Sequence, residues 1–168
     1  GNNLINGSSI MPNPWVISFD LDDTLICDRA ATPQEPRISW FWRTLSRNEP
    51  MRLGACELFA ELRKRGWKTA IYTTSYRKVG SIRRWLRAHG IVGVKLVVNQ
   101  VSHIKMQSRL GLISTPSKNP LWFGIDLHVD DSTGVRAEGY ALGFSVVVIE
   151  PDDLDWAKKV LDAVKAVE

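Results

Sequence analysis

Acidic residues at close spacing follow an apolar run near the start of the chain, where Asp20, Asp22 and Thr24 come directly after Trp15 to Phe19. A short apolar run that ends abruptly in acids is typical of a buried parallel strand whose carboxyl end opens onto a site. If the chain leaves this strand in a tight turn, the carboxylates of Asp20 and Asp22 share one pocket. They could then act as a nucleophile and a proton carrier, although Asp and Thr are also ordinary cap and turn residues.

Polar side chains end two further apolar runs. Thr73 and Thr74 end one of them, and the pair Asp130 and Asp131 ends another. Because the carboxyl ends of parallel strands meet at one edge of a sheet, segments far apart in the sequence can bring these side chains together.

Strands that alternate with helices account for most of the chain. Apolar residues at helical spacing, basic last turns and glycine stops predict the helices, and short apolar runs predict the strands. Residues 99–120 are mostly loop by composition. The alternation predicts an α/β fold, a three-layer doubly wound (Rossmann-like), mainly parallel sheet with its ligand site where strand order reverses. The expected strands are 15–19, 67–72, 94–98, 125–129 and 144–149, and the expected helices are 53–62, 79–88, 135–141 and 154–167.

A length of 168 residues suits one compact domain and is short for two. Residues 1–14 are rich in Asn, Gly, Ser and Pro, and we interpret them as a flexible tail or tag remnant. Residues 15–168 are then a single domain. Within it, residues 25–52 form a small flap or cap after the first strand.

Composition favours an ordinary globular protein, with 44% hydrophobic and 24% charged residues. The best apolar run, Val146 to Ile149, has only the length of a strand, so no membrane association is expected. Cys27 and Cys56 show neither a CxxC spacing nor a disulfide framework, which favours a reducing cytoplasm. A net charge of +4 attracts anions but is common among soluble enzymes.

The order of these motifs resembles the haloacid dehalogenase (HAD) superfamily. VISFDLDDTL is similar to its first motif, AIYTTS to its second, with Thr73 the better match and Thr74 the reserve, and LHVDDS to its fourth. The third motif is a lysine ahead of the fourth strand, for which Lys118 in TPSKNP fits best and Lys105 is possible. The pattern spans residues 15 to about 149.

The resemblance implies a phosphatase, a hydrolase that acts on phosphoric monoester bonds with Mg²⁺ as cofactor. Asp20 would attack phosphorus and form an aspartyl phosphate, and Asp22 would be the general acid and base. Thr73 or Thr74 and Lys118 would bind the phosphate. The metal ligands would be Asp20, the main-chain carbonyl of Asp22, Asp130 and, as an additional acid, Asp131.

The Trp- and Arg-rich flap bears on the substrate, which would be a small phosphorylated molecule or a macromolecular end. Members of the resembled superfamily with minimal caps tend to have open sites, which would suit a phosphoprotein or a nucleic-acid end. We expect instead that the flap aromatics Trp40, Phe41 and Trp42 pack beneath it. A primary role in nucleic-acid binding is not favoured, because Trp67, Trp85 and Trp156 occupy positions suited to core packing.

Several other polar residues have ordinary structural interpretations. Arg77 could reach a second substrate anion or be a solvated helix residue. Asp126 is expected to be a hydrogen-bonded structural acid, Asp23 a turn or cap residue, and Cys27 a buried thiol. The histidines lack ligand spacing, so zinc is not expected. A binding or regulatory module without turnover is the remaining alternative to an enzyme.

Overall fold

The computed structural model describes residues 15–29, 31–46, 48–113 and 116–168. The predicted tail, residues 1–14, lies outside the described residues. Five parallel strands form one sheet in the order β3-β2-β1-β4-β5, as expected for an α/β fold. The strands are β1 (Val16–Phe19), β2 (Lys68–Tyr72), β3 (Leu96–Val98), β4 (Leu127–Asp130) and β5 (Ser145–Val148).

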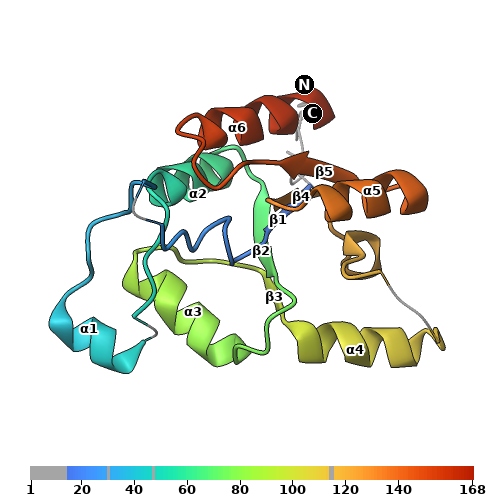
Figure 1. Cartoon of the computed structure of the whole chain (residues 1–168), viewed down its shortest axis with the longest axis horizontal. Coiled ribbons are helices and arrows are strands. Elements are labelled where there is room, and N and C mark those ends of the chain that lie inside the picture. Colours follow the sequence, from blue (N-terminus) through green and yellow to red (C-terminus); the bar gives the residue numbers. More distant parts are fainter. Residues whose placement is uncertain (1–14, 30, 47, 114–115) are drawn as a thin grey trace, which may run out of the picture.

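Helices connect the strands (Figure 1). All four helices predicted from the sequence are present, although the bounds of some shift by a few residues. None of the helices in the described part of the chain is both long and apolar enough to cross a bilayer. The α-helices are α1 (Trp40–Leu45), α2 (Ala55–Lys64), α3 (Val79–Ala88), α4 (Gln100–Arg109), α5 (Thr133–Leu142) and α6 (Trp156–Val167), and a 3₁₀ helix, η1, covers Pro120–Phe123.

The two faces of the sheet differ in polarity. Alternate residues such as Ile17 and Phe19 on β1 face the main apolar core, which α2, α3 and α6 cover. The opposite face carries a smaller cluster that includes Val16 and Tyr72, and its neighbours include the buried polar side chains Ser18 and His128. The expected core positions of Trp67, Trp85 and Trp156 are confirmed, since each is at most 3% exposed.

The prediction that residues 99–120 are mostly loop was wrong. They contain α4, whose first turn is capped by the Asn99 side chain, which accepts a hydrogen bond from the Ser102 amide. His103 is the one buried residue described in α4. A helix with such a narrow buried face has weak apolar periodicity, and this explains why composition suggested a loop.

The flap, residues 25–52, contains one short helix, α1, and the expectation that its aromatics pack beneath it was also wrong. Trp40, Phe41 and Trp42 are 70%, 55% and 46% exposed. No residue of α1 is buried. Figure 1 shows α1 projecting at the lower left of the molecule beside α3. The flap thus presents aromatic surface to solvent.

Arg52 holds the end of the flap to the loop before α6. Its side chain is fully buried and donates hydrogen bonds to the carbonyl oxygens of Thr24, Glu150 and Asp153. The guanidinium also lies 4.8 Å from the centre of the Trp156 ring. These contacts join the loop after β1 to the segment after β5 and support the carboxyl edge of the sheet.

Replacing Arg52 by Met should destabilise the protein while preserving most of the buried volume. One buried and two partly buried hydrogen bonds from a charged donor would be lost, and bonds of this kind contribute about 1.5–3 kcal/mol each without being additive. We expect a loss of about 3 kcal/mol in the free energy of unfolding, measured by urea denaturation. Lys158→Met, which removes an exposed i,i+4 ion pair with Asp162, should cost less than about 0.5 kcal/mol. Equal effects of the two substitutions would contradict the role of Arg52.

Candidate active site

A tight turn after β1 sets the position of the first acids. The carbonyl of Leu21 accepts hydrogen bonds from the amides of Thr24, Leu25 and Ile26. Asp23 lies in this turn with φ of 60°, a left-handed conformation that Asp tolerates better than most residues. The turn therefore separates Asp20, which stays at the sheet edge, from Asp22, which faces outward. Asp23 is a turn residue, as predicted.

Asp20 is bound by two side chains in a buried position. Lys118 Nζ lies 2.8 Å from Asp20 Oδ1, and the Thr24 hydroxyl donates to Asp20 Oδ2 over 3.3 Å. The same Lys118 Nζ lies 2.5 Å from Asp130 Oδ2. Lys118 therefore joins the ends of β1 and β4 by a buried cation, whereas Lys105 is exposed on α4.

Asp130 receives a second donor from within its own strand. His128 Nε2 lies 2.8 Å from Asp130 Oδ2, and the Ser18 hydroxyl lies 2.6 Å from His128 Nδ1. Because a carboxylate only accepts, Nε2 carries the hydrogen, and Nδ1 accepts from the Ser18 hydroxyl. Burial lowers the pKa of His128, which is consistent with this neutral form. The Ser18–His128–Asp130 chain was not predicted from the sequence.

Burial and charge act differently on the two acids that Lys118 contacts. Burial raises the pKa of Asp20 to about 6, although the Lys118 ammonium opposes this shift. Burial also works against ionisation of Asp130, but the hydrogen bond from His128 and the charge of Lys118 hold its pKa well below its usual range. Burial lowers the pKa of Lys118, but the attraction of Asp20 and Asp130 outweighs burial, so the pKa is raised overall. The site is therefore a charged cluster in which Asp130 has a lower pKa than Asp20 and is the more readily ionised of the two.

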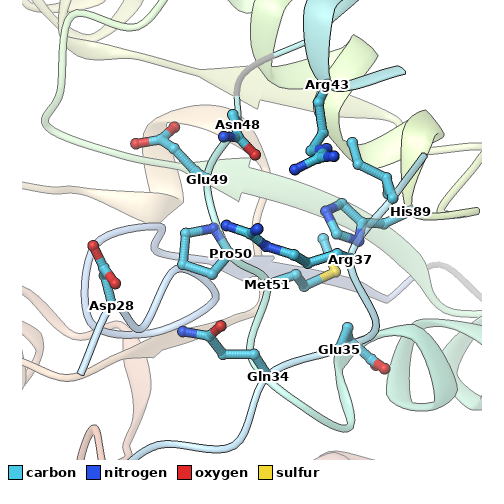
Figure 2. A pocket seen from close by; sticks show the side chains of 11 residues that line it. Asp28, Gln34, Glu35, Arg37, Arg43, Asn48, Glu49, Pro50, Met51 and His89 are labelled. Carbon is cyan, nitrogen blue, oxygen red and sulfur yellow. The ribbon is translucent and has the colours of Figure 1, made fainter. Parts of the chain in front are cut away.

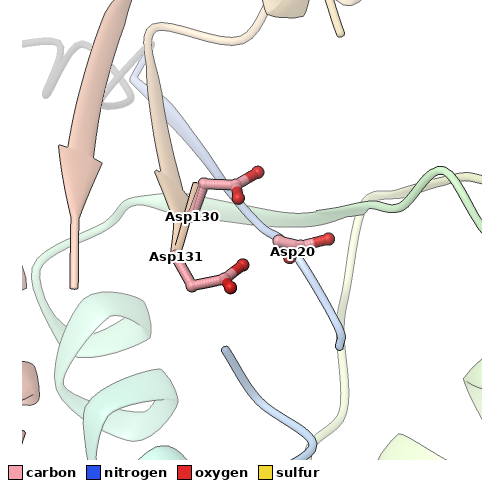
Figure 3. Close-up of side chains that lie close together, drawn as sticks. All are labelled: Asp20, Asp130 and Asp131. Carbon is pink, nitrogen blue, oxygen red and sulfur yellow. The ribbon is translucent and has the colours of Figure 1, made fainter. Parts of the chain in front are cut away.

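The three acids Asp20, Asp130 and Asp131 can each place one carboxylate oxygen within 4.8 Å of the others (Figure 3). Burial and the neighbouring Asp130 raise the pKa of Asp131. Three carboxylates face one ammonium group, so the cluster has an excess of negative charge and of oxygen donors. Mg²⁺ prefers oxygen ligands, and the donor set fits this ion. Among the described residues this is the one cluster of potential metal ligands found.

Asp22 lies outside this cluster and is bound to Arg77. The Arg77 guanidinium donates to both Asp22 oxygens over 2.8 and 2.9 Å and also contacts the Glu49 carboxylate of the flap. The Asp22 side chain is 58% exposed, whereas that of Arg77 is 12% exposed. Arg77 is therefore not the solvated helix residue that one interpretation predicted, and its guanidinium already has anionic partners.

Thr73 and Thr74 differ in their surroundings. Thr73 follows β2 directly, is buried, and its hydroxyl oxygen accepts a hydrogen bond from the Ser75 amide. The register pairs Phe19 with Ile71, so Thr73 lies one residue further along its strand than the partner of Asp20. Thr74 is exposed and lines a surface pocket with Pro116 and Ser117, away from the three acids. Position at the sheet edge favours Thr73.

Two structural interpretations from the sequence are confirmed. Asp126 accepts a hydrogen bond from the Val16 amide over 2.8 Å. Cys27 is a buried free thiol.

Comparison of the sequence with models of known families and with curated proteins finds no match. The structure is similar to several solved structures. One is a HAD-superfamily hydrolase, subfamily IA, from Geobacter sulfurreducens, with a TM-score of 0.53, 13% identity, and coverage of 89% of this chain and 98% of that chain. Another is a predicted phosphoglycolate phosphatase from Haemophilus somnus, with a TM-score of 0.53, 15% identity, and coverage of 93% and 99%.

The position of the acid cluster agrees with these similarities. Strand order reverses at β1, which lies between β2 and β4, and open α/β sheets bind their ligands at such a switch point. Asp20 follows β1, and Asp130 and Asp131 end β4. The family resemblance drawn from the motifs is thus confirmed at the level of architecture: the chain has the fold of the HAD-superfamily hydrolases.

Proposed function

We propose that the protein is a HAD-superfamily phosphohydrolase that cleaves phosphate monoesters with the help of Mg²⁺. The observation that carries this proposal is the meeting of Asp20, Lys118, Asp130 and Asp131 at the switch point of the sheet. Lys118 lies 98 residues from Asp20 in the sequence and still contacts it directly. The fold shared with a predicted phosphoglycolate phosphatase supports the same class of reaction.

A divalent cation answers the electrostatic problem of this reaction. A phosphate monoester is anionic and repels a carboxylate nucleophile, and bound Mg²⁺ would screen both and stabilise the charge that develops on the phosphoryl oxygens. The side chains of Asp20, Asp130 and Asp131 and the main-chain carbonyl of Asp22 are the proposed ligands.

Asp20 is the proposed nucleophile. One of its oxygens forms a bond to phosphorus, the bond from phosphorus to the ester oxygen breaks, and Asp22 gives its proton to the departing alcohol. Asp22 then takes a proton from water as that water attacks the aspartyl phosphate, which releases inorganic phosphate and restores Asp20. One difficult hydrolysis thereby becomes two easier displacements.

The ion pair with Arg77 sets a condition on the role of Asp22. Both oxygens of Asp22 accept hydrogen bonds from Arg77, so the carboxyl group must exchange this partner for the leaving oxygen. The exposed position of Asp22 allows such a rotation. Glu49 keeps Arg77 paired when Asp22 leaves it.

Lys118 and Thr73 are the proposed ligands of the phosphoryl group, with Thr74 as the alternative hydroxyl. Lys118 is already held at the cluster by Asp20 and Asp130, where its ammonium would neutralise phosphoryl charge. Thr73 would offer its hydroxyl at the neighbouring strand end.

The free thiols Cys27 and Cys56 support a reducing, cytoplasmic location, which we propose for the protein.

Release of phosphate from p-nitrophenyl phosphate should require Mg²⁺ and should be lost in Asp20→Asn, which lacks the nucleophilic oxygen. Asp22→Asn should retain the fold and lose about 10²–10⁴-fold in kcat on an alkyl phosphate, because proton transfer to the leaving group is removed. Initial rates of phosphate release measure both effects.

Asp23→Asn is the matched control for this experiment. Asp23 lies in the same turn, but its carboxylate pairs with the exposed Arg29, so the rate should stay within a factor of about two. No turnover over a broad panel of esters, together with tight anion binding that Asp22→Ala leaves unchanged, would instead support a binding module without catalysis.

His128→Phe should weaken Mg²⁺ binding without removing a proposed ligand. Asp130 would lose the donor that fixes its orientation, and the loss of such a partner typically costs about 10–100-fold in metal affinity. Mg²⁺ titration by calorimetry measures the effect, and His128→Gln should recover part of it because the amide is also a donor. His128→Phe with unchanged affinity and unchanged thermal stability would exclude a positioning role.

The exposed aromatics of α1 favour a second, narrower candidate: a substrate with a macromolecular end, such as a phosphorylated nucleic-acid terminus. Trp40, Phe41 and Trp42 are the kind of surface on which bases stack, and Arg37 and Arg43 lie in the same segment. This observation contradicts the packed arrangement expected from the sequence and therefore raises the weight of a bulky substrate.

KM for an oligonucleotide with a terminal phosphate should then rise steeply with salt and increase in Trp40→Ala, because stacking contributes about 1–3 kcal/mol per base. KM for p-nitrophenyl phosphate should change little in the same variant. Identical salt dependence for the two substrates would argue for small phosphorylated molecules.

A further inference from the structure

A second cavity lies under the flap, apart from the acid cluster. Its volume is about 160 Å³, and its walls come from the flap, the segment before α2 and the end of α3 (Figure 2). Neither the acids of the cluster nor Lys118 line it. The charged and ionisable side chains that line it are Asp28, Glu35, Arg37, Arg43, Glu49 and His89.

Two polar atoms of this wall are shielded from solvent and have no hydrogen-bond partner among the described residues. They are Arg43 Nε and His89 Nε2. Figure 2 shows the Arg43 side chain reaching down from α1 toward the space beside the His89 ring. A buried polar atom without a partner is costly and uncommon, so two of them at one cavity are a reason to look for a ligand there.

The wall offers guanidinium donors that no ion pair occupies. Arg37 and Arg43 form no ion pair with a described acid, whereas two of the three wall acids are already engaged. Glu49 pairs with Arg77, and Glu35 accepts hydrogen bonds from the amides of Gly54 and Cys56. Glu35 keeps its negative charge in these bonds, so the two guanidinium groups share the wall with the carboxylates of Asp28 and Glu35. Their donors outside any ion pair, and not an excess of positive charge, are what suits an oxyanion.

His89 adds a donor without adding charge. Burial lowers the pKa of its imidazole, which favours the neutral ring, and the tautomer with its hydrogen at Nε2 can donate to an oxyanion. Its main-chain carbonyl accepts a hydrogen bond from the Cys56 thiol, which fixes the end of α3 against α2.

We infer that this cavity is a binding site for a small oxyanion, a carboxylate or phosphate group, held by Arg43, Arg37 and His89. Guanidinium groups suit both anions because their planar donors match two oxygens at once. The volume admits one such group with a few further atoms. The group could belong to a separate small molecule or to the far end of the substrate.

Binding of sodium malonate, a small dicarboxylate, tests the site without any turnover. Calorimetry on the Asp20→Asn protein without Mg²⁺ should detect malonate binding, and Arg43→Gln or Arg37→Gln in that background should weaken it about tenfold, or about 1.4 kcal/mol. Arg109→Gln, at the exposed end of α4, is the matched control and should leave the affinity unchanged. Thermal unfolding without malonate should be the same in all variants, because Arg37 and Arg109 are exposed and α1, which carries Arg43, has no buried residue.

Kinetics on the protein with Asp20 intact distinguish the two sources of the anion. If the anion is part of the substrate, Arg43→Gln raises KM for a phosphate ester that carries a carboxylate and leaves KM for p-nitrophenyl phosphate unchanged. If it is a separate molecule, malonate alters kcat for p-nitrophenyl phosphate, and Arg43→Gln abolishes that effect.

The binding measurement decides the inference by itself. Absence of malonate binding, or equal affinity in the Arg43→Gln, Arg37→Gln and Arg109→Gln proteins, would overturn it. This result would not bear on phosphatase activity, which rests on the acid cluster. Loss of activity in Asp20→Asn would likewise leave the cavity's affinity untouched.

Discussion

Three carboxylates and one ammonium group share a small space at the carboxyl edge of the sheet, and the rest of the site depends on how their charges are balanced. Asp20 and Asp130 are largely removed from water, so each would be costly to ionise alone. Lys118 contacts both, and His128 donates to Asp130. One ammonium group leaves the cluster negative, and this residual charge suits it to a divalent cation.

This arrangement explains why one face of the sheet is more polar than the other. The face covered by α2, α3 and α6 is filled by aliphatic and aromatic side chains. The opposite face contains Ser18 and His128, which occupy volume that apolar residues would otherwise fill. Hydrogen bonding satisfies both ring nitrogens of His128, so the polar chain is tolerated in the interior and orients Asp130.

The sequence predicted the parts of the site that local pattern determines. Apolar runs ending in Asp20 and Asp130 indicated strand ends, and parallel pairing then required these ends to meet. The contact between Ser18 and His128 spans 110 residues and depends on the register of β1 with β4, which no local pattern reveals. The bond from Arg77 to Asp22 likewise depends on where the turn after β1 faces. The exposure of Trp40 was missed because an aromatic residue carries the same hydrophobic signal whether or not a partner surface exists.

Position alone would divide the two proposed roles, nucleophile and proton carrier, between the identical side chains of Asp20 and Asp22. Their side chains are 10% and 58% exposed, and each has its own cation: Lys118 for Asp20 and Arg77 for Asp22. Asp20 is confined by Lys118 and Thr24, so its oxygens stay at a fixed place, as a nucleophile requires. Asp22 is held by Arg77 at the surface, in a contact that it can exchange, and its proposed role in proton transfer would need this freedom. The turn through Asp23 produces this difference, because it sends two carboxylates only two residues apart into opposite environments.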